Sequence, residues 1–579
     1  MNCPIGTRGE TVLDELIRST FSISQFLLIV LAIAILVRCL RSMLRERYES
    51  ETWAYIRLGR DNLPVQHWEN ILGRSRSADV RIPRKKVARV HAVLTRSDKD
   101  IWTVYDVFGK RGVWVNGQKV GPEGTELESG DTINLGGNRM RFLRIGEEDR
   151  RRLERKRTRP GKVIAPFGTL LELTVFQILL LLQHCLTAEE QYLTSIALAY
   201  ATLILLQWAV YIMMRLIDRT GFEIELLSFF LTTLGLEVAA TSTPEDMFKQ
   251  VLLMLASVLA FLLMGAWLRN LGRTTTLRKA AGVLTITLLA INVLVSDEVF
   301  GARNWIYFGG YSFQPSELVK VFYLYVGAST LDRLYRKRNL ITFISFSIVC
   351  VGALALIGDF GTALVFFTCF LVISFMRSGS IATVLLALTS AGLAGFLAVS
   401  IKPYIAQRFA TWGHVWEDIY DTGYQQARAM SAAASGGLFG KGAGAGWLKD
   451  IVAANTDMVF AVICEELGLI IAICMVLAVL ALAFFALRSA RHGRTAYFAI
   501  ASCGAMAMLM VQMGLNVFGS LDILPFTGVT FPFVSRGGSS LLSCWMLMAF
   551  LKGADNRRDA SFVVRPAEAD LPPLSDEEE

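Results

Sequence analysis

The sequence predicts a polytopic α-helical membrane protein with an all-β domain inserted near its N-terminus, and three observations lead to this fold class. The chain has 579 residues, of which 53% are hydrophobic and 19% charged, whereas soluble globular proteins are roughly 45–50% apolar and about 25% charged. Its apolar residues form unbroken runs, unlike the alternating pattern of a porin-type barrel. Residues 52–146 differ from the rest, because they are polar and contain short β-type runs. These observations exclude a soluble enzyme, a disordered scaffold and a disulfide-rich secreted domain.

The first apolar run, residues 21–37, is long enough to cross a hydrocarbon core about 30 Å thick. A basic cluster that includes Arg38, Arg41 and Arg45 follows this run instead of preceding it, and no small-residue cleavage site closes it. These features distinguish a membrane anchor from a secretory signal peptide. We therefore expect residues 1–50 to form an anchor whose N-terminus lies outside the cell.

Residues 51–147 are expected to form the all-β domain. Short β-type runs lie at 102–105 and 113–115, and Asn116-Gly117 is the turn signal of a tight hairpin. A basic linker, residues 148–165, follows this domain and contains the sequence RRRLERKRTRPGK. Because cytoplasmic segments of membrane proteins are rich in lysine and arginine, both the domain and the linker are predicted to be cytoplasmic.

From residue 166 onward, apolar runs alternate with polar connections. Basic blocks recur on every second connection, as the positive-inside rule requires, so the net charge of +8 indicates cytoplasmic loops and not nucleic-acid binding. A helix pair (166–217) precedes a core (218–553) with a long outside loop (401–457), and a polar tail (554–579) follows. The predicted spans are 166–186, 192–214, 222–241, 247–268, 279–297, 314–331, 339–357, 361–376, 381–400, 458–487, 495–518 and 530–551.

The order of residues in the β-rich segment resembles a forkhead-associated (FHA) domain. The resemblance rests on Gly73-Arg74, on Asp79–Ile82, on Val87–Ala92 and on Val113–Gly117, which occur in the order of that family. It implies a β-sandwich that binds phosphothreonine peptides through loops at one end, and hence a phosphothreonine-bearing partner protein and a Ser/Thr kinase system.

By this resemblance, Arg74, Arg89 and Asn116 are the phosphopeptide-binding residues, with Arg74 on the phosphate and Asn116 on the peptide backbone. His91 would be structural. The phosphate-contacting serine of the family falls on Ala88. One hydrogen bond to a charged phosphate contributes about 1.5–3 kcal/mol, so we expect weakened phosphothreonine binding, with a scaffold domain that no longer reads phosphate as the alternative.

Polar and charged residues gather on the predicted outside face, where charges beside lipid are costly and are therefore functional candidates. They suit a substrate with a phosphorylated head and an apolar tail, because arginine and lysine hold a diphosphate and a carboxylate acts as a base or holds a divalent cation. For Asp457, an N-cap of the following span is the competing interpretation. The clusters are Arg303–Trp305, Gln314–Glu317 with Lys320, Gly358–Thr362, Trp416–Asp418, Gly423–Gln425, Gly436–Gly446, Asn455–Asp457, Glu465–Gly468, Leu524–Gly528 and Phe531–Ser540.

The glycine-rich run 436–446 does not fit a nucleotide site. A P-loop requires Gly-x4-Gly-Lys-Ser/Thr, but Ser435 occupies the first glycine position and Gly442 follows Lys441. The sequence also contains no His-Glu-x-x-His zinc motif. The chemistry of the outside face is therefore expected to rest on its carboxylates and cations.

Taken in order, the clusters closely resemble the SEDS family (shape, elongation, division and sporulation), the RodA/FtsW-type peptidoglycan glycosyltransferases. The resemblance covers roughly residues 218–553 and rests on Trp305 with the Gln-Pro-Ser-Glu-Leu run at 314–318, Asp-x-Gly-Thr at 359–362, Thr-Asp-x-x-Phe-Ala-x-x-x-Glu-Glu-Leu-Gly at 456–468 and Phe-Pro-x-x-Ser-x-Gly-Gly-Ser-Ser at 531–540. It implies ten spans with the catalytic loop outside between the seventh and the eighth. The anchor, the FHA-like domain and the first helix pair are then additions to the family core.

The resemblance implies polymerisation of lipid II into glycan strands, with release of undecaprenyl diphosphate and inversion at the anomeric carbon. The essential aspartate of the family falls on Asp457, which would deprotonate the acceptor or hold Mg²⁺ or Mn²⁺ on the diphosphate. Glu317, Glu465 and Glu466 are alternatively structural, bonded inside the bundle. The expected substrate-binding residues are Arg303, Gln314, Glu317, Lys320, Glu417, Asp418, Lys441, Ser535 and Ser539.

Arg536 departs from the family, which usually has a tyrosine at this position, and we expect it to pair with a neighbour or to reach a lipid headgroup. The implied partner is a class B penicillin-binding protein transpeptidase, and the implied location is the bacterial plasma membrane. Two other functions stay open: a flippase for a lipid-linked precursor, and a catalytically silent scaffold for cell-wall proteins. A flippase needs a continuous polar path, for which spans 339–357, 361–376 and 381–400 are too apolar.

Overall fold

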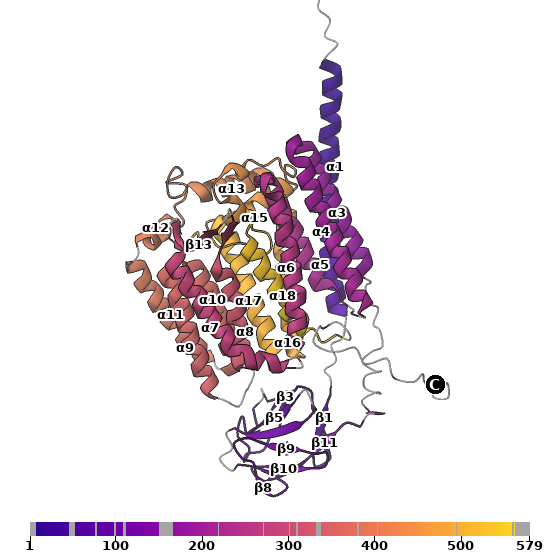
Figure 1. The fold of residues 1–579 in the computed structure, drawn as a ribbon, viewed down its shortest axis with the longest axis vertical. Helices are drawn as coiled ribbons and strands as arrows, with labels where there is room; N and C mark the ends of the chain where they lie inside the picture. Colours follow the sequence, from indigo (N-terminus) through magenta and orange to yellow (C-terminus); the bar gives the residue numbers. More distant parts are fainter. Residues whose placement is uncertain are drawn as a thin grey trace, which may run out of the picture.

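The computed structural model shows a helical bundle and a separate β-domain beside one end of it (Figure 1). It describes residues 7–45, 52–75, 78–97, 100–107, 112–146, 148–149, 166–217, 219, 221–269, 271–299, 302–308, 311–331, 337–378, 381–401, 403–493, 495–557 and 561. We call the end of the bundle beside the β-domain the near end, and the opposite end the far end. His67 of the β-domain lies within hydrogen-bond distance of the Gly493 carbonyl at the near end.

The β-domain is a sandwich of two sheets, which confirms the all-β prediction. A six-stranded sheet has the order β2-β1-β11-β10-β7-β8, and a five-stranded sheet has the order β4-β3-β5-β6-β9. Apolar side chains from both sheets, with Trp102 and Phe142 at the centre, form a buried core. The strands are β1 (Ala54–Leu58), β2 (Asp61–Val65), β3 (Glu69–Gly73), β4 (Val80–Arg81), β5 (Ala92–Arg96), β6 (Trp102–Asp106), β7 (Val113–Val115), β8 (Gln118–Lys119), β9 (Thr125–Leu127), β10 (Thr132–Leu135) and β11 (Asn138–Arg144).

The hairpin predicted at Asn116-Gly117 is present between β7 and β8. Trp114 pairs with Lys119 and Val115 with Gln118. Asn116 and Gly117 both have positive φ angles, of 50° and 86°. A two-residue turn needs this left-handed geometry to match the twist of its strands, which is why Asn-Gly is favoured there.

The helical bundle contains three helices before the core and ten long helices within it, as the fold-class prediction states. Ten helices in the described part of the chain are long and apolar enough to cross a membrane. The helices α8 and α18 are shorter, with 17 residues each, and within α11 the described apolar segment is Val384–Phe396. The first three helices are α1 (Thr7–Arg45), α3 (Pro166–Thr187) and α4 (Glu190–Leu216). The ten of the core are α5 (Glu223–Ser242), α6 (Met247–Trp267), α7 (Leu271–Val295), α8 (Pro315–Leu331), α9 (Lys337–Ile357), α10 (Phe360–Ser378), α11 (Ile381–Ile401), α16 (Leu469–Arg491), α17 (Ala496–Ser520) and α18 (Gly538–Ala554).

The prediction of one continuous span over 458–487 is wrong. The chain forms α15 (Val459–Leu467) and α16, which are separated by Gly468 with a φ of +89°. A Cβ at this glycine would lie 2.4 Å from the Leu438 carbonyl oxygen. The helix breaks because another segment of backbone lies against it, which the apolar run in the sequence does not reveal. The last predicted span, 530–551, begins later, because residues 530–537 form turns before α18.

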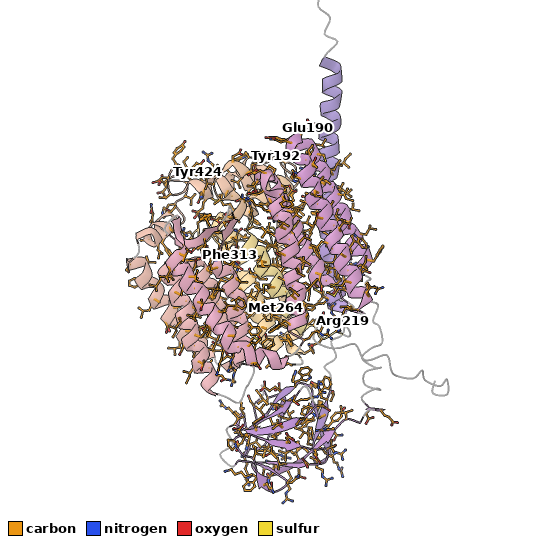
Figure 2. The ribbon with its side chains drawn as sticks, viewed as in Figure 1. Glu190, Tyr192, Arg219, Met264, Phe313 and Tyr424 are labelled. Carbon is orange, nitrogen blue, oxygen red and sulfur yellow. The ribbon has the colours of Figure 1, made fainter. Side chains whose placement is uncertain are left out.

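The long loop 401–457 contains short helices and lies at the far end. Tyr424, at the start of α13, lies there with Glu190 and Tyr192 of α4, whereas Arg219 lies at the near end (Figure 2). A small sheet precedes α8 and contains β12 (Asp297–Val299), β13 (Ala302–Phe308) and β14 (Tyr311–Phe313). The elements of the loop are α12 (Pro403–Thr411), α13 (Tyr424–Gly436), a 3₁₀ turn (Leu448–Asp450) and α14 (Ala454–Asp457).

Candidate active site at the far end

A cavity of about 840 Å³ opens among the loops and helix ends around Asp457. Its polar wall carries three carboxylates, and its other walls are mainly apolar side chains from α10, α11 and α12. Among the lining residues are Trp305, Gln314, Glu317, Asp359, Phe396, Val399, Arg408, Phe409, Trp412, Asp457, Phe526 and Gly528. A cavity of this kind suits a ligand with one polar and one apolar part.

Asp457 ends the single-turn helix α14 and is held in place through its backbone. Its carbonyl oxygen accepts hydrogen bonds from Asn516 Nδ2 (3.0 Å) and Ser520 Oγ (3.4 Å), both on α17. On the other side, Ser535 Oγ donates to the Thr456 carbonyl and accepts from the Phe531 N–H. The carboxylate is therefore free of these bonds and faces the cavity.

Gly528 provides the space for this carboxylate. Its φ is +67°, and a Cβ there would lie 3.1 Å from Asp457 Oδ2. A larger residue would meet both a strained backbone and a crowded carboxylate. The Leu-Pro-Phe-Thr-Gly segment at 524–528 thus shapes the cavity around Asp457.

The surroundings of Asp457, which lies outside the candidate spans, raise its pKa to about 6. Burial is the main cause, because it disfavours the charged form. A hydrogen bond from Thr456 and the positive charge of Arg408 lower the pKa, while the negative charge of Asp359 raises it further. The result is a carboxylate that exchanges a proton near neutral pH.

Two predicted substrate-binding residues, Gln314 and Glu317, line the cavity. Gln314 Nε2 lies 3.5 Å from Asp359 Oδ2, and the Thr362 N–H donates to Asp359 Oδ1 at 2.9 Å. Glu317 is buried and accepts a hydrogen bond from Ser543 Oγ at 2.9 Å. Glu317 was predicted either to bind substrate or to be structural. It fits both interpretations, because it is bonded inside the bundle and also lines the cavity.

Lys320 does not reach the cavity. Its side chain is 0% exposed and its Nζ lies 2.5 Å from Glu317 Oε2 on the preceding turn of α8. A buried ion pair of this kind holds the helix within the bundle and offers no free cation to a diphosphate. The periodicity of a helix predicts the contact between these positions, but only the packing shows that both are buried.

The charged residues predicted from the long loop also lie away from the cavity lining. Glu417 and Asp418 are exposed, and Asp418 accepts a hydrogen bond from Thr422 at 3.0 Å. Lys441 is paired with the fully buried Glu465 at 2.7 Å. Ser539 accepts a hydrogen bond from the Gln314 N–H at 3.4 Å. Like Ser535, it therefore holds a residue next to the cavity and does not line the cavity itself. The side chain of Arg303 lies outside the described residues.

Arg408 is the cation that sequence reasoning missed. It belongs to α12, lies on the cavity wall, and attracts the Asp457 carboxylate. Its Nη1 donates to the Phe526 carbonyl at 3.3 Å, which ties α12 to the segment beside Gly528. No recognised motif contains Arg408. The only available signal was its place in a long loop that the sequence predicts to lie outside.

Arg536 pairs with a neighbour, as expected from its position. Its side chain bonds Asp246 at the start of α6, and its N–H donates to the Asn455 carbonyl at 2.8 Å. Lys249 also pairs with Asp246, at 2.8 Å. Arg536 therefore links α6 to the segment that carries Asp457.

In the β-domain, Arg74 and Arg89 lie on adjacent loops at one end of the sandwich. The Arg74 N–H donates to the Ala88 carbonyl at 2.9 Å, and both arginine side chains are exposed. His91 is buried and its Nδ1 accepts from the Ala88 N–H at 3.1 Å, which is a structural role. The side chain of Asn116 forms hydrogen bonds within the β-domain. Its Nδ2 donates to Asp131 Oδ1 at 2.8 Å, and its Oδ1 accepts from the Thr132 N–H at 2.9 Å.

The described residues contain no cluster of three or more histidine, cysteine or acidic side chains arranged to hold a metal ion. Asp457 is nevertheless a suitable single ligand, because Mg²⁺ in phosphate-processing sites is commonly held by one or two carboxylates together with substrate phosphates. The donor set therefore fits a divalent cation that is held together with substrate phosphates.

Fold and site together define a class: a many-helix membrane protein with a carboxylate-lined cavity at one end and a β-sandwich domain beside the other. Comparison with known proteins shows which family within this class the chain belongs to. A family model described as "Cell cycle protein", for FtsW, RodA and SpoVE, matches residues 226–559, which is more than half of the chain. The chain belongs to this family, and it also carries an FHA domain, matched over residues 70–136.

Several relatives support this assignment. The peptidoglycan glycosyltransferase RodA of Mycobacterium tuberculosis is 30% identical over 322 residues, which is 52% of this chain and 69% of that protein. The probable peptidoglycan glycosyltransferase FtsW of Tolumonas auensis is 32% identical over 291 residues, 48% and 76% of the two chains. Stage V sporulation protein E of Bacillus subtilis is 32% identical over 259 residues, 43% and 69%.

Solved structures are also similar. A chain from a structure described as a peptidoglycan synthase complex that coordinates polymerization and crosslinking is 25% identical, with a TM-score of 0.48, and the match covers 58% of this chain and 98% of that one. The Rod shape determining protein RodA of Thermus thermophilus is 24% identical, with a TM-score of 0.44, over 58% and 97% of the two chains.

Proposed function

We propose that this protein is a peptidoglycan glycosyltransferase that polymerises lipid II into glycan strands, with Asp457 as its catalytic carboxylate. One observation carries the proposal: the aspartate of the Thr-Asp motif faces a cavity with a polar wall and apolar walls in a chain whose relatives are named peptidoglycan glycosyltransferases. The far end of the bundle is then the outside face, and the FHA domain is cytoplasmic.

The cavity suits the two parts of a lipid-linked sugar. Arg408 supplies a positive charge beside Asp457 and is a candidate to bind a diphosphate, because guanidinium groups bind phosphate oxygens in two parallel hydrogen bonds. Phe396 and Val399 of α11 and Phe409 of α12 also line the cavity. An isoprenoid tail is expected to lie along these apolar residues, which the enzyme would bury from water on binding.

In the proposed reaction, an acceptor GlcNAc hydroxyl attacks the anomeric carbon of the donor MurNAc. The Asp457 carboxylate accepts the hydroxyl proton, the new glycosidic oxygen–carbon bond forms, and the bond to the diphosphate oxygen breaks with its electron pair. Attack opposite the leaving group inverts the anomeric carbon. The leaving undecaprenyl diphosphate carries the negative charge that Arg408 is placed to stabilise.

A divalent cation, Mg²⁺ or Mn²⁺, would neutralise the diphosphate when bound with the substrate. Asp457 is the residue that would contact it, as the alternative to its role as the base. The task of the chain is then to orient the acceptor hydroxyl and to exclude water from the anomeric carbon, for which the apolar walls are suited.

The activity is expected to fall as the pH drops through about 6, because a proton on Asp457 removes the base. At pH 7.5 the carboxylate is mostly ionised, whereas at pH 5 roughly one tenth remains ionised and kcat/KM falls about tenfold. Initial rates of glycan-strand formation from labelled lipid II by the purified protein, measured between pH 5 and 8, test both the function and the base.

Recovery of the rate after return from pH 5 to pH 7.5 controls for unfolding. Polymer with an acidic midpoint near 6 supports the proposal, and a rate that stays level down to pH 5 contradicts the role of Asp457. If the folded protein bound lipid II without forming polymer at any pH, a flippase or a scaffold would explain the fold better. Transfer of lipid II across a liposome membrane would then favour the flippase, and the absence of transfer would favour the scaffold.

The FHA domain is proposed to recruit a phosphothreonine-bearing protein, and the glycosyltransferase core a class B penicillin-binding protein transpeptidase. Arg74→Ala is expected to lower the affinity of the full-length protein for a phosphothreonine peptide by roughly tenfold or more, because charge-assisted hydrogen bonds to phosphate are lost. Ala88→Ser should raise the affinity about tenfold, because it adds a hydroxyl beside the two arginines.

Fluorescence anisotropy with phosphorylated and unphosphorylated peptides measures both effects. Arg139→Ala, an exposed arginine on β11, is the matched control and should bind as the wild type does. Binding that ignores the phosphate, or that survives Arg74→Ala, would identify a scaffold domain instead.

A further inference from the structure

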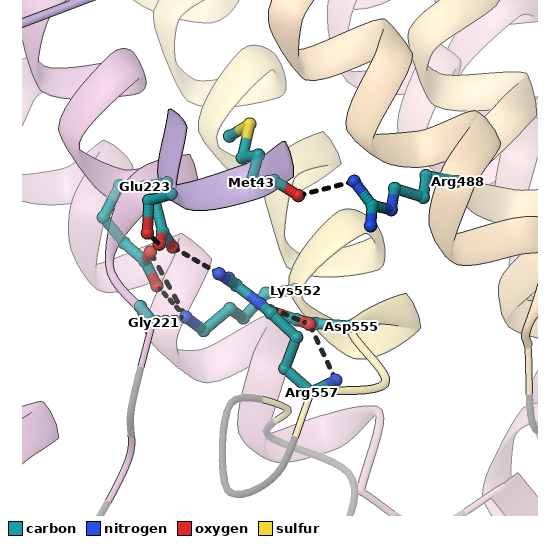
Figure 3. Close-up of polar contacts among 9 residues, drawn as sticks. Met43, Gly221, Glu223, Arg488, Lys552, Asp555 and Arg557 are labelled. Atoms are coloured by element: carbon teal, nitrogen blue, oxygen red, sulfur yellow. Dashed lines mark hydrogen bonds and ion pairs between the residues drawn. The ribbon is translucent and has the colours of Figure 1, made fainter. Parts of the chain in front are cut away.

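The three helices that precede the core are packed into it. At the near end, Ser42 of α1 donates to Glu223 of α5 at 2.6 Å, and Arg488 Nη1 of α16 donates to the Met43 carbonyl at 2.8 Å (Figure 3). In the middle of the bundle, Gln177 of α3 donates to Thr233 of α5 at 2.9 Å. These contacts bind α1 and α3 to the core along its length.

At the far end, α3 holds one loop residue by both of its backbone groups. Gln183 Oε1 accepts from the Ala443 N–H at 2.9 Å, and Thr187 Oγ1 donates to the Ala443 carbonyl at 2.8 Å. Gln25 of α1 donates to the Gly440 carbonyl at 3.1 Å. The loop needs glycine next to Thr187, because a Cβ at Gly444 would lie 2.6 Å from Thr187 Oγ1.

The same loop closes the end of the broken helix α15. The Lys441 and Gly442 N–H groups donate to the carbonyls of Glu465 and Glu466, at 2.9 and 2.8 Å. The Gly444 N–H donates to Glu466 Oε2 at 3.1 Å. The last carbonyls of a helix have no partner within it, so these bonds fix where α15 ends.

The α15 helix begins two residues after Asp457. Its nine residues span about 13 Å, and Asp457 precedes its first turn at the cavity. Thr241 of α5 donates to Glu466 Oε2 at 3.0 Å, and His184 of α3 lies 2.8 Å from Glu237, also on α5. One end of α15 is therefore held by α5 and by the loop, both of which are bonded to α3, and the carboxylate of Asp457 lies just before the other end.

We propose that the far end of α3 positions the catalytic segment, with Gln183 and Thr187 as positioning residues that hold loop 440–446 and, through α15, Asp457. This inference rests on the proposed polymerase function of the site. The three N-terminal helices lie outside the residues that the family model matches. In this protein, α3 would therefore add to the family core a contact that fixes the position of the active-site segment.

The test compares Thr187→Val, which removes the hydroxyl at similar volume, with Thr187→Ser, which keeps it, and with Gln183→Leu. The matched controls are Thr202→Val, whose hydroxyl bonds only the Leu198 carbonyl of its own helix, and the exposed Gln191→Leu. We expect kcat to fall about tenfold in Thr187→Val and Gln183→Leu, with KM within about twofold of the wild-type value. Thr187→Ser and the controls should match the wild type.

Hydrogen exchange of amides 440–460 gives a second readout that needs no activity. Faster exchange in the loop and around Asp457, in the two disruptive variants alone, supports the positioning role even if no polymer forms. Unchanged exchange around Asp457 overturns it, as would a loss of rate that only follows the amount of folded protein. Absence of polymer from the wild type would count against the proposed function and not against this contact.

Discussion

Asp457→Asn is expected to reduce the rate of glycan-strand formation by roughly 10²- to 10⁴-fold, which is the usual contribution of a general base. Asparagine has the shape of aspartate but cannot accept the proton of the acceptor hydroxyl. The bonds that hold this residue come from Asn516 and Ser520 to its backbone carbonyl, so they survive the substitution. Binding of lipid II and folding should therefore change little.

The measurement is the initial polymerisation rate of purified protein at pH 7.5, with Asp421→Asn as the matched control. Asp421 is an exposed carboxylate of the same long loop and lies outside the cavity lining. The asparagine variant should also lose the acidic limb of the pH profile in whatever activity remains. If Asp457→Asn kept more than about a tenth of the wild-type rate, Asp457 would not be the base.

Lys552→Met is expected to lower the free energy of unfolding by about 3–5 kcal/mol, because it leaves a buried carboxylate without its partner. The side chain of Lys552 (Figure 3) is 0% exposed, and its Nζ lies 2.9 Å from Oε1 of Glu225, which is also 0% exposed. It also donates to the Gly221 carbonyl at 2.7 Å. Neighbouring Arg557 already bonds Asp555 and Glu223, so it is not available to replace the lost charge.

The double variant Lys552→Met/Glu225→Gln removes both charges and should recover most of this loss, because the cost comes from the unpaired charge. Arg38→Met is the surface control. Its pair with Glu172 is partly exposed, at 43% and 22%, and should contribute no more than about 1 kcal/mol. Unfolding midpoints in one detergent at one heating rate rank the four proteins. A double variant as unstable as the single one would contradict the explanation.

Much of the fold could be predicted, because the length of a membrane span and the residues of a tight turn both depend on residues that are close together in the sequence. A run of about 20 apolar residues is needed to cross the membrane, so the runs at 192–214 and 495–518 gave helices at nearly those positions, α4 and α17. Asn116-Gly117 formed its hairpin for an equally local reason, because few residues adopt the positive φ angles that the turn demands.

The candidate site was only partly predictable. Asp457, Gln314 and Glu317 could be named because they belong to short motifs with a recognisable order. Lys320 and Lys441 lie in the polar clusters of the sequence, but both are paired with carboxylates of the bundle and do not line the cavity. The residue type alone does not separate a cation that holds the fold from one that faces a ligand.

By itself, the sequence determined which segments enter the membrane, which segment forms the sandwich, and which aspartate to examine, because apolar length, turn chemistry and motif order are properties of neighbouring residues. Only the tertiary structure decided that Gly468 breaks a span, that Arg408 joins Asp457, and that α3 holds Ala443. Each of these depends on segments that are distant along the chain. Their proximity is set by the packing of whole helices, in which one close approach of backbone outweighs a local preference for helix.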